Sequence, residues 1–441
     1  TNIVEVAYAK SVGVDFILSV QYLPIHEEGN GQKVPDAVAV INSKQDLCNY
    51  HDDMLCGCAV AWKLACAVLA NLRKENVNTE VYEKVTALPA GWEKWMLDLV
   101  GISTISDMVP LVKENRALAH YGLKVLRKTK RPGLLHVFNE QRIKKEYLTE
   151  EDIAFTIAPR VNAASRMGVP IQAHHMLYEK DVEKAENYAR DLEALNTARK
   201  SDVKDITSGI SFDHAVYQND VVVVGDMSWG PGILGLIAQK IIDETGKSTF
   251  VWGQGEDKNT VKGSCRSRGD VHVVDLMARC IDLFPGVITH SGGHEQAGGF
   301  SCSLERIDEL SNALNESLKH VEIKELGSQE ISVDADLSMD DINEVTYQSV
   351  APLAPFGVGN PKPIFGFTNV TPLATKRFGK KSEHLEVIYP TSKGGKIKAI
   401  QFFVKEETEK RSSGAHNLLA HLEKSYFAGK TELRLRIVEI R

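Results

Sequence analysis

Residues 221–242 read VVVVGDMSWGPGILGLIAQKII, and this stretch decides the fold class. The four valines indicate a buried strand, the glycines and proline at 230–232 indicate a turn, and the apolar run ILGLIAQKII indicates a helix. A second apolar strand is expected at Thr249–Trp252. A strand, a turn and a helix in this order are typical of an α/β protein.

The chain upstream of this unit predicts a second α/β lobe and a connector. Residues 151–212 carry a long, charge-laced helical pattern, which can join two lobes. Before it, residues 3–13 predict a short helix, residues 14–20 (VDFILSV) a buried strand, and residues 57–73 another helix.

The pattern changes again after about residue 325, where short strands alternate with Gly, Pro and Lys turns. Residues 366–441 predict a small β-barrel, because HLEVIY and LRLRIVEI alternate apolar and polar residues. The predicted order is therefore α/β, helical connector, α/β and all-β.

Composition sets the broad class of the protein. The 441 residues are 43% hydrophobic and 25% charged, and the net charge of -7 gives no global basic field, although a basic groove can be confined to one face. No run of ~18 apolar residues and no charged-then-apolar leader is found, so a cytoplasmic location without a membrane partner is expected. The seven cysteines are expected to be reduced thiols.

The first candidate site residue is Asp107, in GISTISDMVPLVKENRAL at residues 101–118. Asp107 is expected to follow a strand of small and apolar residues. The carboxyl end of a parallel strand is where α/β sheets place catalytic groups. A helix cap is the alternative for an isolated aspartate.

A second candidate site lies in IAFTIAPRVNAASRMG at residues 153–168, a short segment interrupted by proline. Arg160 and Arg166, with Asn162 between them, could bind phosphate oxygens in bidentate fashion. The alternative is two surface arginines that pair with local carboxylates.

The second lobe carries two glycine-rich strings, GSCRSR at 263–268 and HSGGHEQAGGF at 290–300. Glycines allow close backbone approach to an anion, and hydroxyl and basic side chains add donors. A phosphate cradle is one interpretation, and a pair of tight turns is the other. The candidate ligands are Ser264, Arg266, Gly292, Gly293 and His294.

The C-terminal section combines aromatic and basic residues. LAPFGVGNPKPIF at 353–365 forms a compact Pro/Gly loop. Such residues on a small barrel suit binding of single strands by stacking and backbone attraction, whereas scattered lysines alone suit a solvated face. The basic residues that follow are Lys376, Arg377, Lys380, Lys381, Lys396 and Lys398.

Taken together, these strings resemble the RecJ family of DHH phosphoesterases, which are single-strand-specific DNA exonucleases. The resemblance rests on the Asp107 string, IAPRVNAASRMG, LNTARKSD at 195–202, WGPGILGLIA, GSCRSR, SGGHEQAGGF and LAPFGVGNPKPIF, in this order. It implies four regions: a partial DHH phosphoesterase domain at 1–165, a helical connector at 166–212, a DHH-associated domain at 213–325, and an OB-fold nucleic-acid-binding domain at 326–441.

The resemblance also implies an activity. It is 5′-to-3′ removal of nucleotides from single-stranded DNA, in DNA repair and recombination, with two Mn²⁺ or Mg²⁺ ions that activate a water. Asp107 would be a catalytic residue and a metal ligand. Single-stranded DNA is the implied partner, with a single-strand-binding protein or a helicase as candidate protein partners.

The sequence departs from the family pattern where a strand should end in Asp-His-His. Val20, Gln21 and Tyr22 stand there, and these are not ordinary ligands of hard cations. His26 and the run at 51–53 (HDD) are possible substitutes, but loop residues that face water are the favoured interpretation. The two-ion site is therefore expected to be incomplete, and the chain to be a fragment or to need a partner.

Two other functions remain open. A non-catalytic relative could keep the phosphate cradle and barrel and bind single-stranded nucleic acid without cleaving it. A phosphodiesterase of oligonucleotides or cyclic dinucleotides ranks last, because a dinucleotide needs no extended surface for a strand.

Overall fold

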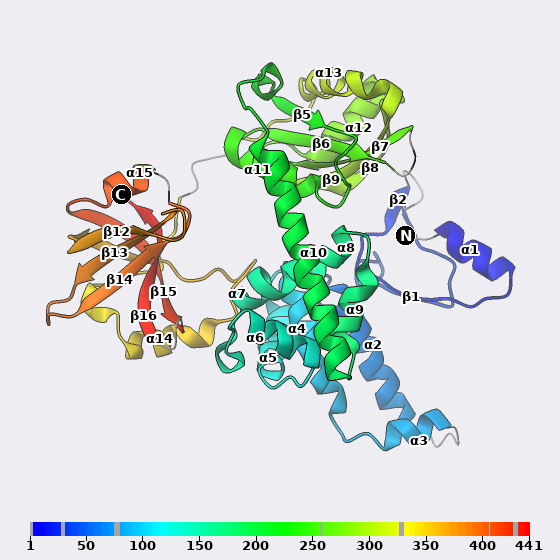
Figure 1. Ribbon diagram of the computed structural model, residues 1–441. Coiled ribbons are helices and arrows are strands. Elements are labelled where there is room, and N and C mark those ends of the chain that lie inside the picture. Colours follow the sequence, from blue (N-terminus) through cyan, green and yellow to red (C-terminus); the bar gives the residue numbers. More distant parts are fainter. Residues whose placement is uncertain are drawn as a thin grey trace. The chain divides into compact units, whose positions relative to one another are not determined.

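The computed structural model describes residues 3–27, 31–74, 80–255, 257, 259–325, 330–404, 406–426 and 431–441 (Figure 1). The chain divides into two compact units. The first comprises Thr1–Thr129, Phe138–Ile157 and Ile331–Arg441, and the second comprises Lys130–Val137 and Ala158–Glu330.

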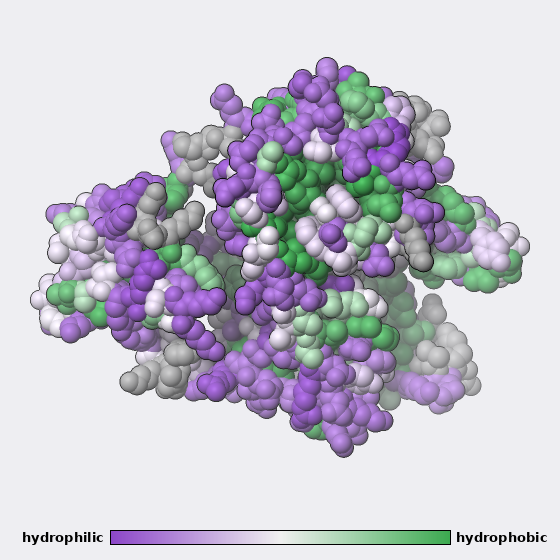
Figure 2. Space-filling model, turned by 45° about the horizontal axis from the view of Figure 1, so that its top comes forward, coloured by the Kyte–Doolittle hydropathy of each residue, from purple (hydrophilic) through white to green (hydrophobic). Residues whose placement is uncertain are grey.

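The first unit begins with helix α1 (Ile3–Ser11) and a small parallel sheet of β1 (Ile17–Ser19) and β4 (Ala39–Ile41). A strand within 14–20 is confirmed as β1, but the prediction that it is buried was wrong, since it has three residues and Ile17 is 62% exposed. Parallel strands are normally covered on both faces, and two strands alone offer little cover. Figure 2 shows hydrophobic side chains at the surface on the right of the view, where Figure 1 has α1.

Helix α4 (Leu97–Ser106) overturns the prediction of a strand before Asp107. The helix crosses α5 (Lys113–Leu126) at two glycines, and an added Cβ on Gly101 would lie 2.8 Å from the Cα of Gly122. Seven of the ten residues of α4 are buried, so it lacks a polar face. A short apolar run without a polar face cannot be told from a buried strand by its periodicity.

The remaining elements of this region are short. The predicted helix over 57–73 is confirmed as α2. The elements are β2 (Ile25–Glu27), β3 (Gly31–Lys33), α2 (Gly57–Leu72), α3 (Glu80–Thr86), the 3-10 helices Trp92–Met96 and Lys145–Tyr147, α6 (Pro132–Glu140), which crosses the unit boundary, α7 (Glu150–Asp152) and the π-helical turn Ile153–Ile157.

The C-terminal part of the first unit is a seven-stranded sheet in the order β10-β11-β15-β16-β14-β13-β12. Alternation along β13 buries Leu385, Val387 and Tyr389, as predicted from HLEVIY. The bounds are β10 (Ala335–Asp336), 3-10 helix Met339–Asp341, α14 (Glu344–Val350), 3-10 helix Ala351–Leu353, β11 (Phe365–Val370), β12 (Ala374–Phe378), β13 (His384–Pro390), β14 (Lys396–Gln401), α15 (Glu406–Arg411), β15 (His416–Ser425) and β16 (Glu432–Ile440).

The second unit contains the helical connector, which is three helices rather than one run. They are α8 (Ala158–Arg166), α9 (Pro170–Tyr178) and the 27-residue α10 (Val182–Ser208). Pro170 begins α9, and the Asp181 side chain accepts a hydrogen bond from the Lys184 N–H at 2.9 Å to cap α10.

A five-stranded mixed sheet in the order β5-β6-β7-β9-β8 forms the rest of this unit. Alternate valines of β5 face opposite sides, since Val222 packs in the core with α11, whereas Val221 and Val223 pack with α12 and α13. The bounds are 3-10 helix Ala215–Gln218, β5 (Val221–Gly225), α11 (Leu234–Thr245), β6 (Ser248–Gln254), β7 (Thr260–Arg266), α12 (Val273–Leu283), β8 (Ile288–His294), β9 (Ala297–Ser303), 3-10 helix Leu304–Arg306 and α13 (Ile307–Leu318).

The strand-turn-helix prediction at 221–242 is thus confirmed, but the two glycine-rich strings are paired strands and not tight turns. GSCRSR lies mainly in β7, and HSGGHEQAGGF forms β8, β9 and the hairpin between them. All seven cysteines are free thiols, as expected. Within the described ranges, no helix is both long and apolar enough to cross a membrane.

Candidate anion-binding site

One face of the second unit's sheet carries the predicted phosphate ligands. Val261 and Cys265 of β7 face the core with α12, so Ser264 and Arg266 point to the opposite face, where α11 lies. Arg266 pairs in register with Ala297, which pairs with His294, so Arg266 and His294 stand on this same face.

Glycines leave the sheet between these side chains uncovered. Ser264 is in register with Gly299, and Gly299 with Gly292, so the row crosses three strands. An added Cβ on Gly292 would meet nothing within 4 Å, whereas one on Gly293 would lie 2.4 Å from the Ala297 carbonyl oxygen. Gly292 therefore provides space, and Gly293, at φ +149, provides a close backbone approach.

The N-terminus of α11 adjoins the same side chains. Gly235 lies so near Arg266 that an added Cβ would be 2.7 Å from its Nη2 and 3.1 Å from Ser264 Oγ. No side chain caps this helix, whose N-cap is Ile233. Uncapped N–H groups and the helix dipole favour an anion here.

Arg166, at the end of α8, joins this helix start. Its Nη1 donates to the Gly232 carbonyl at 3.1 Å, and an added Cβ on Gly232 would lie 1.8 Å from the Arg166 carbonyl oxygen. Asn162 is exposed one helical turn earlier on the same face of α8. Arg160 lies elsewhere, since it is buried and paired with Glu193 of α10.

Arg199 of α10 is a site residue that sequence reasoning missed. Its Nη2 donates to Asn196 Oδ1 at 2.9 Å, and its Nε is buried without a hydrogen-bond partner among the described residues. The Nδ2 of Asn196, a fully buried residue, is also unpartnered there. The only sequence signal was its place in LNTARKSD, a string that indicated the connector alone.

We name Arg166, Arg199 and Arg266 the arginine cluster. Burial lowers the pKa of Arg199 from its usual value, and the nearby charge of Arg166 lowers it further. Burial also lowers the pKa of Arg266, and the nearby charge of Arg166 lowers it by a smaller amount. Within the described part of the chain, none of the three forms an ion pair with a carboxylate.

A pocket of about 660 Å³ opens beside the cluster. Arg166, the Trp229–Ile233 turn, and Asp202 and Asp205 of α10 all line it. Because the guanidinium groups are partly desolvated and lack carboxylate partners, an anion that accepts several hydrogen bonds would satisfy them.

Asp107 lies in the first unit, at the C-terminal end of α4, where its backbone N–H donates to the Ser103 carbonyl at 2.9 Å. The Gln21 amide Nε2 donates to Asp107 Oδ2 at 3.1 Å. The tertiary structure thus brings together two residues 86 apart in sequence. Gln21 also covers the start of α2, since an added Cβ on Gly57 would lie 2.2 Å from its Oε1.

The other two positions of the Val20-Gln21-Tyr22 stretch are structural. The Val20 N–H donates to the Ile41 carbonyl at 3.0 Å, continuing the parallel pairing of β1 and β4. The Tyr22 carbonyl accepts from the buried Asn42 amide at 2.9 Å, while the Tyr22 ring is exposed.

These residues do not fit a two-ion centre. An amide N–H₂ group faces the one matched carboxylate, and a cation would require oxygen ligands there. No group of three His, Cys, Asp or Glu residues that could hold a metal occurs in the described ranges. Of the possible substitutes, Asp52 is buried rather than water-facing, His51 lies 3.6 Å from Glu114, and the His26 side chain lies outside the described residues.

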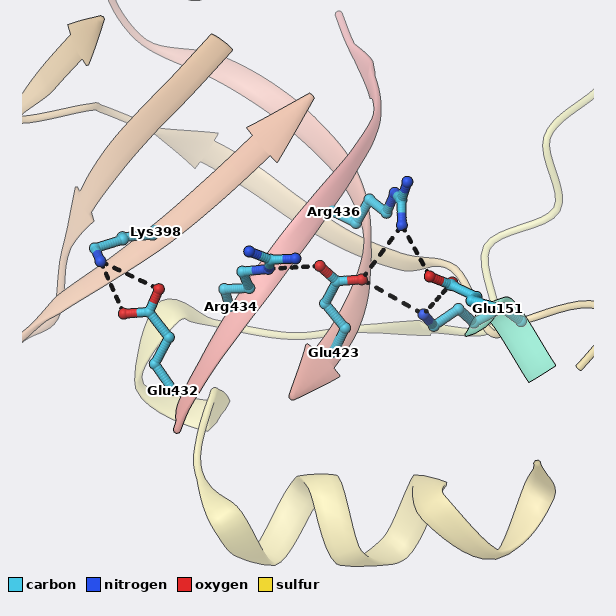
Figure 3. A network of polar contacts seen from close by, with 7 residues as sticks. Glu151, Lys398, Glu423, Glu432, Arg434 and Arg436 are labelled. Atoms are coloured by element: carbon cyan, nitrogen blue, oxygen red, sulfur yellow. Dashed lines mark hydrogen bonds and ion pairs between the residues drawn. The ribbon is translucent and has the colours of Figure 1, made fainter. Parts of the chain in front are cut away.

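The basic residues of the C-terminal sheet are partly neutralised. Lys376 pairs with Glu386 at 2.9 Å, and Arg377 pairs with Glu409 at 2.6 Å. Lys398 pairs with Glu432 at 2.8 Å, as Figure 3 shows. Three of the six candidate basic residues are therefore paired, two with carboxylates of the same sheet and one with Glu409 of α15.

Comparisons with known proteins agree with this architecture. The DHHA1 domain model matches residues 218–320, and the RecJ OB domain model matches residues 333–439. The chain is 30% identical to the single-stranded-DNA-specific exonuclease RecJ of Bacillus subtilis over 87% of its own length, and spans 45% of that protein. It is 28% identical to RecJ of Haemophilus influenzae over 98% of its length, and spans 74% of that protein.

The fold is similar to the crystal structure of RecJ in complex with Mn²⁺ from Thermus thermophilus, with a TM-score of 0.78 and 22% identity. That match covers 100% of this chain and 60% of the other. The ordered motifs, the two domain matches and the similarity over nearly the whole chain lead to one conclusion: the chain belongs to the RecJ family of single-stranded-DNA-specific exonucleases, with a DHHA1 domain and a RecJ OB domain.

Proposed function

We propose that this chain binds the 5′-phosphorylated end of single-stranded DNA, and that the arginine cluster holds the terminal phosphate. The observation that carries the proposal is the convergence of Arg166, Arg199 and Arg266 near the uncapped start of α11, without an ion-paired carboxylate among the described residues. Unpaired cations that are partly buried are costly, and a phosphate offsets that cost.

A terminal phosphate fits this site better than an internal one. It carries more charge and exposes three oxygens, which can accept bonds from guanidinium groups, from Ser264 Oγ and from the N–H groups of α11. The uncovered glycines of β8 and β9 leave room for the first nucleotide next to His294. These features support recognition of a strand end.

Hydrolysis in the manner of a 5′-to-3′ exonuclease of DNA repair and recombination is the second candidate, and family membership favours it. It would need Mn²⁺ or Mg²⁺, and hence ligands in addition to Asp107. The described residues around Asp107 do not fit these ions, so no catalytic step is assigned to them. A single-strand-binding protein or a helicase remains a proposed partner.

The test measures fluorescence anisotropy with a 5′-phosphorylated oligonucleotide and its 5′-hydroxyl counterpart. We expect wild-type protein to prefer the phosphate, and Arg266→Gln or Arg199→Gln to raise the Kd of the phosphorylated strand about ten- to a hundredfold. Arg279→Gln, on α12 at the other face of the sheet, is the control.

Equal binding of both strands by the wild type would disprove phosphate recognition. The same oligonucleotides with Mn²⁺ test hydrolysis, since degradation that Asp107→Ala abolishes would establish the exonuclease. Intact DNA beside phosphate-dependent binding would favour the non-catalytic relative.

A further inference from the structure

The pocket beside the arginine cluster carries charges of both signs. Its volume is about 660 Å³, and Arg166 at the end of α8 lines it together with Asp202 and Asp205 of α10. We name Asp202 and Asp205 the acidic pair. A pocket that serves only to hold phosphate groups would not be lined by carboxylates, because like charges repel each other. The acidic pair is therefore not a set of phosphate ligands.

Helix α10 fixes the position of the acidic pair. Val203 and Ile206 of α10 pack in one hydrophobic core with α11, so the two helices lie side by side (Figure 1). Asp202 and Asp205 are three residues apart, and residues at this spacing are neighbours on the surface of a helix. Arg199 lies three residues before Asp202, so about 4.5 Å of axial rise separates the arginine cluster from the acidic pair along α10.

The negative charge of the acidic pair is not neutralised within the described ranges. Both side chains are exposed, and neither forms an ion pair with a lysine or an arginine there. Asp205 Oδ2 accepts a hydrogen bond from Ser201 Oγ at 3.2 Å, which leaves its charge unchanged. Charges within a Debye length of each other, about 8 Å at physiological salt, are only partly screened. An anion that enters the pocket is therefore repelled.

Space does not limit what the pocket holds. An added Cβ on Gly230, in the turn that lines the pocket, would meet nothing within 4 Å, and the same is true of Gly168. Pockets of ~300–1,000 Å³ hold ligands made of several linked groups. A chain of phosphates would therefore fit by volume, so charge and not shape decides which strand end the pocket accepts.

Further phosphates on a strand end would have to enter this pocket. In the proposed function, the first nucleotide lies over the uncovered glycines of β8 and β9, which are not among the lining residues of the pocket. Among the described residues, Arg166 is the member of the arginine cluster that lines the pocket. A second and a third phosphate would extend away from the nucleotide, past Arg166, toward the acidic pair.

We propose that the acidic pair makes the arginine cluster selective for a strand end with one phosphate over an end with three. The proposal rests on the proposed function, since it names which phosphorylated ends the cluster accepts. Hydrolysis of a phosphodiester leaves one phosphate on a 5′ end, whereas synthesis that starts from a nucleoside triphosphate leaves three. The site thereby accepts ends that a cleavage reaction has produced, and repulsion rejects the ends of newly started strands.

The test measures fluorescence anisotropy with one oligonucleotide that carries a 5′ hydroxyl, monophosphate or triphosphate, in EDTA so that no divalent ion shields the charges. Wild-type protein should bind the monophosphate strand about tenfold more tightly than the triphosphate strand. Asp202→Asn and Asp205→Asn each remove one charge and keep the shape, and should each lower the Kd of the triphosphate strand about three- to tenfold. The Kd of the monophosphate strand should change less than about twofold, because its phosphate lies at the arginines.

Asp191→Asn is the matched control, because Asp191 is an exposed carboxylate of α10 outside the pocket lining. It should leave each Kd unchanged. In Asp205→Asn, the tighter binding of the triphosphate strand relative to the wild type should diminish as the salt concentration rises, since ions screen the repulsion. A steric barrier would instead give the same difference at every salt concentration. Circular dichroism should show that all three variants fold as the wild type does, since each site is exposed.

The two proposals fail separately. Equal binding of the hydroxyl and monophosphate strands by the wild type would reject phosphate recognition itself. A wild type that prefers the monophosphate to the hydroxyl, but binds the triphosphate strand at least as tightly, would overturn selection by the acidic pair alone. An equal gain for the monophosphate strand in Asp202→Asn and Asp205→Asn, or a gain of the same size in Asp191→Asn, would also overturn it.

Discussion

The arginine cluster and the surroundings of Asp107 both contain residues of the motifs that resemble the family, and they differ in which polar groups lack a hydrogen-bond partner. At Asp107, the Gln21 amide already donates to the exposed carboxylate. At the cluster, buried donors of Arg199 and Asn196 have no partner in the described ranges. A satisfied carboxylate has little to offer a cation, whereas unsatisfied guanidinium groups require an anion.

The largest effect on the arginine cluster is expected from a substitution at Gly232, where the start of α11 lies against Arg166. Gly232→Ala should lower the free energy of unfolding of the second unit by about 1–3 kcal/mol, because the added Cβ would lie 1.8 Å from the Arg166 carbonyl oxygen. It should also abolish the preference for a 5′ phosphate. Gly209→Ala, where an added Cβ would lie 3.5 Å from the nearest atom, the Ile206 carbonyl oxygen, is the matched control outside the pocket. Urea unfolding and anisotropy of both variants test this, and equal behaviour of the two would contradict it.

A smaller and more selective change is Gly292→Ala. Its Cβ would occupy open space on the sheet face that carries Ser264 and Arg266, so stability should stay within about 0.5 kcal/mol. The Kd of the phosphorylated strand should rise roughly fivefold, which corresponds to about 1 kcal/mol. Gly293→Ala should instead unfold more easily, since its Cβ would lie 2.4 Å from a carbonyl oxygen. If both variants bind the phosphorylated strand as tightly as the wild type does, the strand end lies elsewhere.

The smallest effect is expected at Asp107. Asp107→Ala removes one exposed hydrogen bond and should cost at most about 1 kcal/mol. Mn²⁺ should not raise the Tm of the wild type above that of Asp107→Ala, whereas a bound ion at roughly 100 times its Kd would add about 2.7 kcal/mol. Gln21→Leu, which breaks the same hydrogen bond, is the control. Stabilisation by Mn²⁺ that depends on Asp107 would establish a metal site and remove the contrast between the two regions.

Local pattern was informative where one face of an element is polar. The helix within 221–242 and the alternation of Leu385, Val387 and Tyr389 are recognisable because each period repeats over several residues, whereas strand β5 is buried on both faces and was recognised from its continuous run of valines. Helix α4 was wrongly predicted as a strand, because burial on most sides removes the polar face that marks a helix. The strands in the glycine-rich strings were not predicted for another reason, since Gly292 and Gly293 lie in a strand with few buried side chains.

The sequence by itself determined the order of the lobes and several residue types of the candidate anion-binding site, because strand and helix periods and glycine spacing are local properties. Only the tertiary structure decided which of those residues act together. It separated Arg160, paired with Glu193, from Arg166. It added Arg199 to the cluster and set Gln21 against Asp107. The physical reason is that desolvation and the absence or presence of an opposite charge depend on residues distant in the chain, which no local pattern encodes.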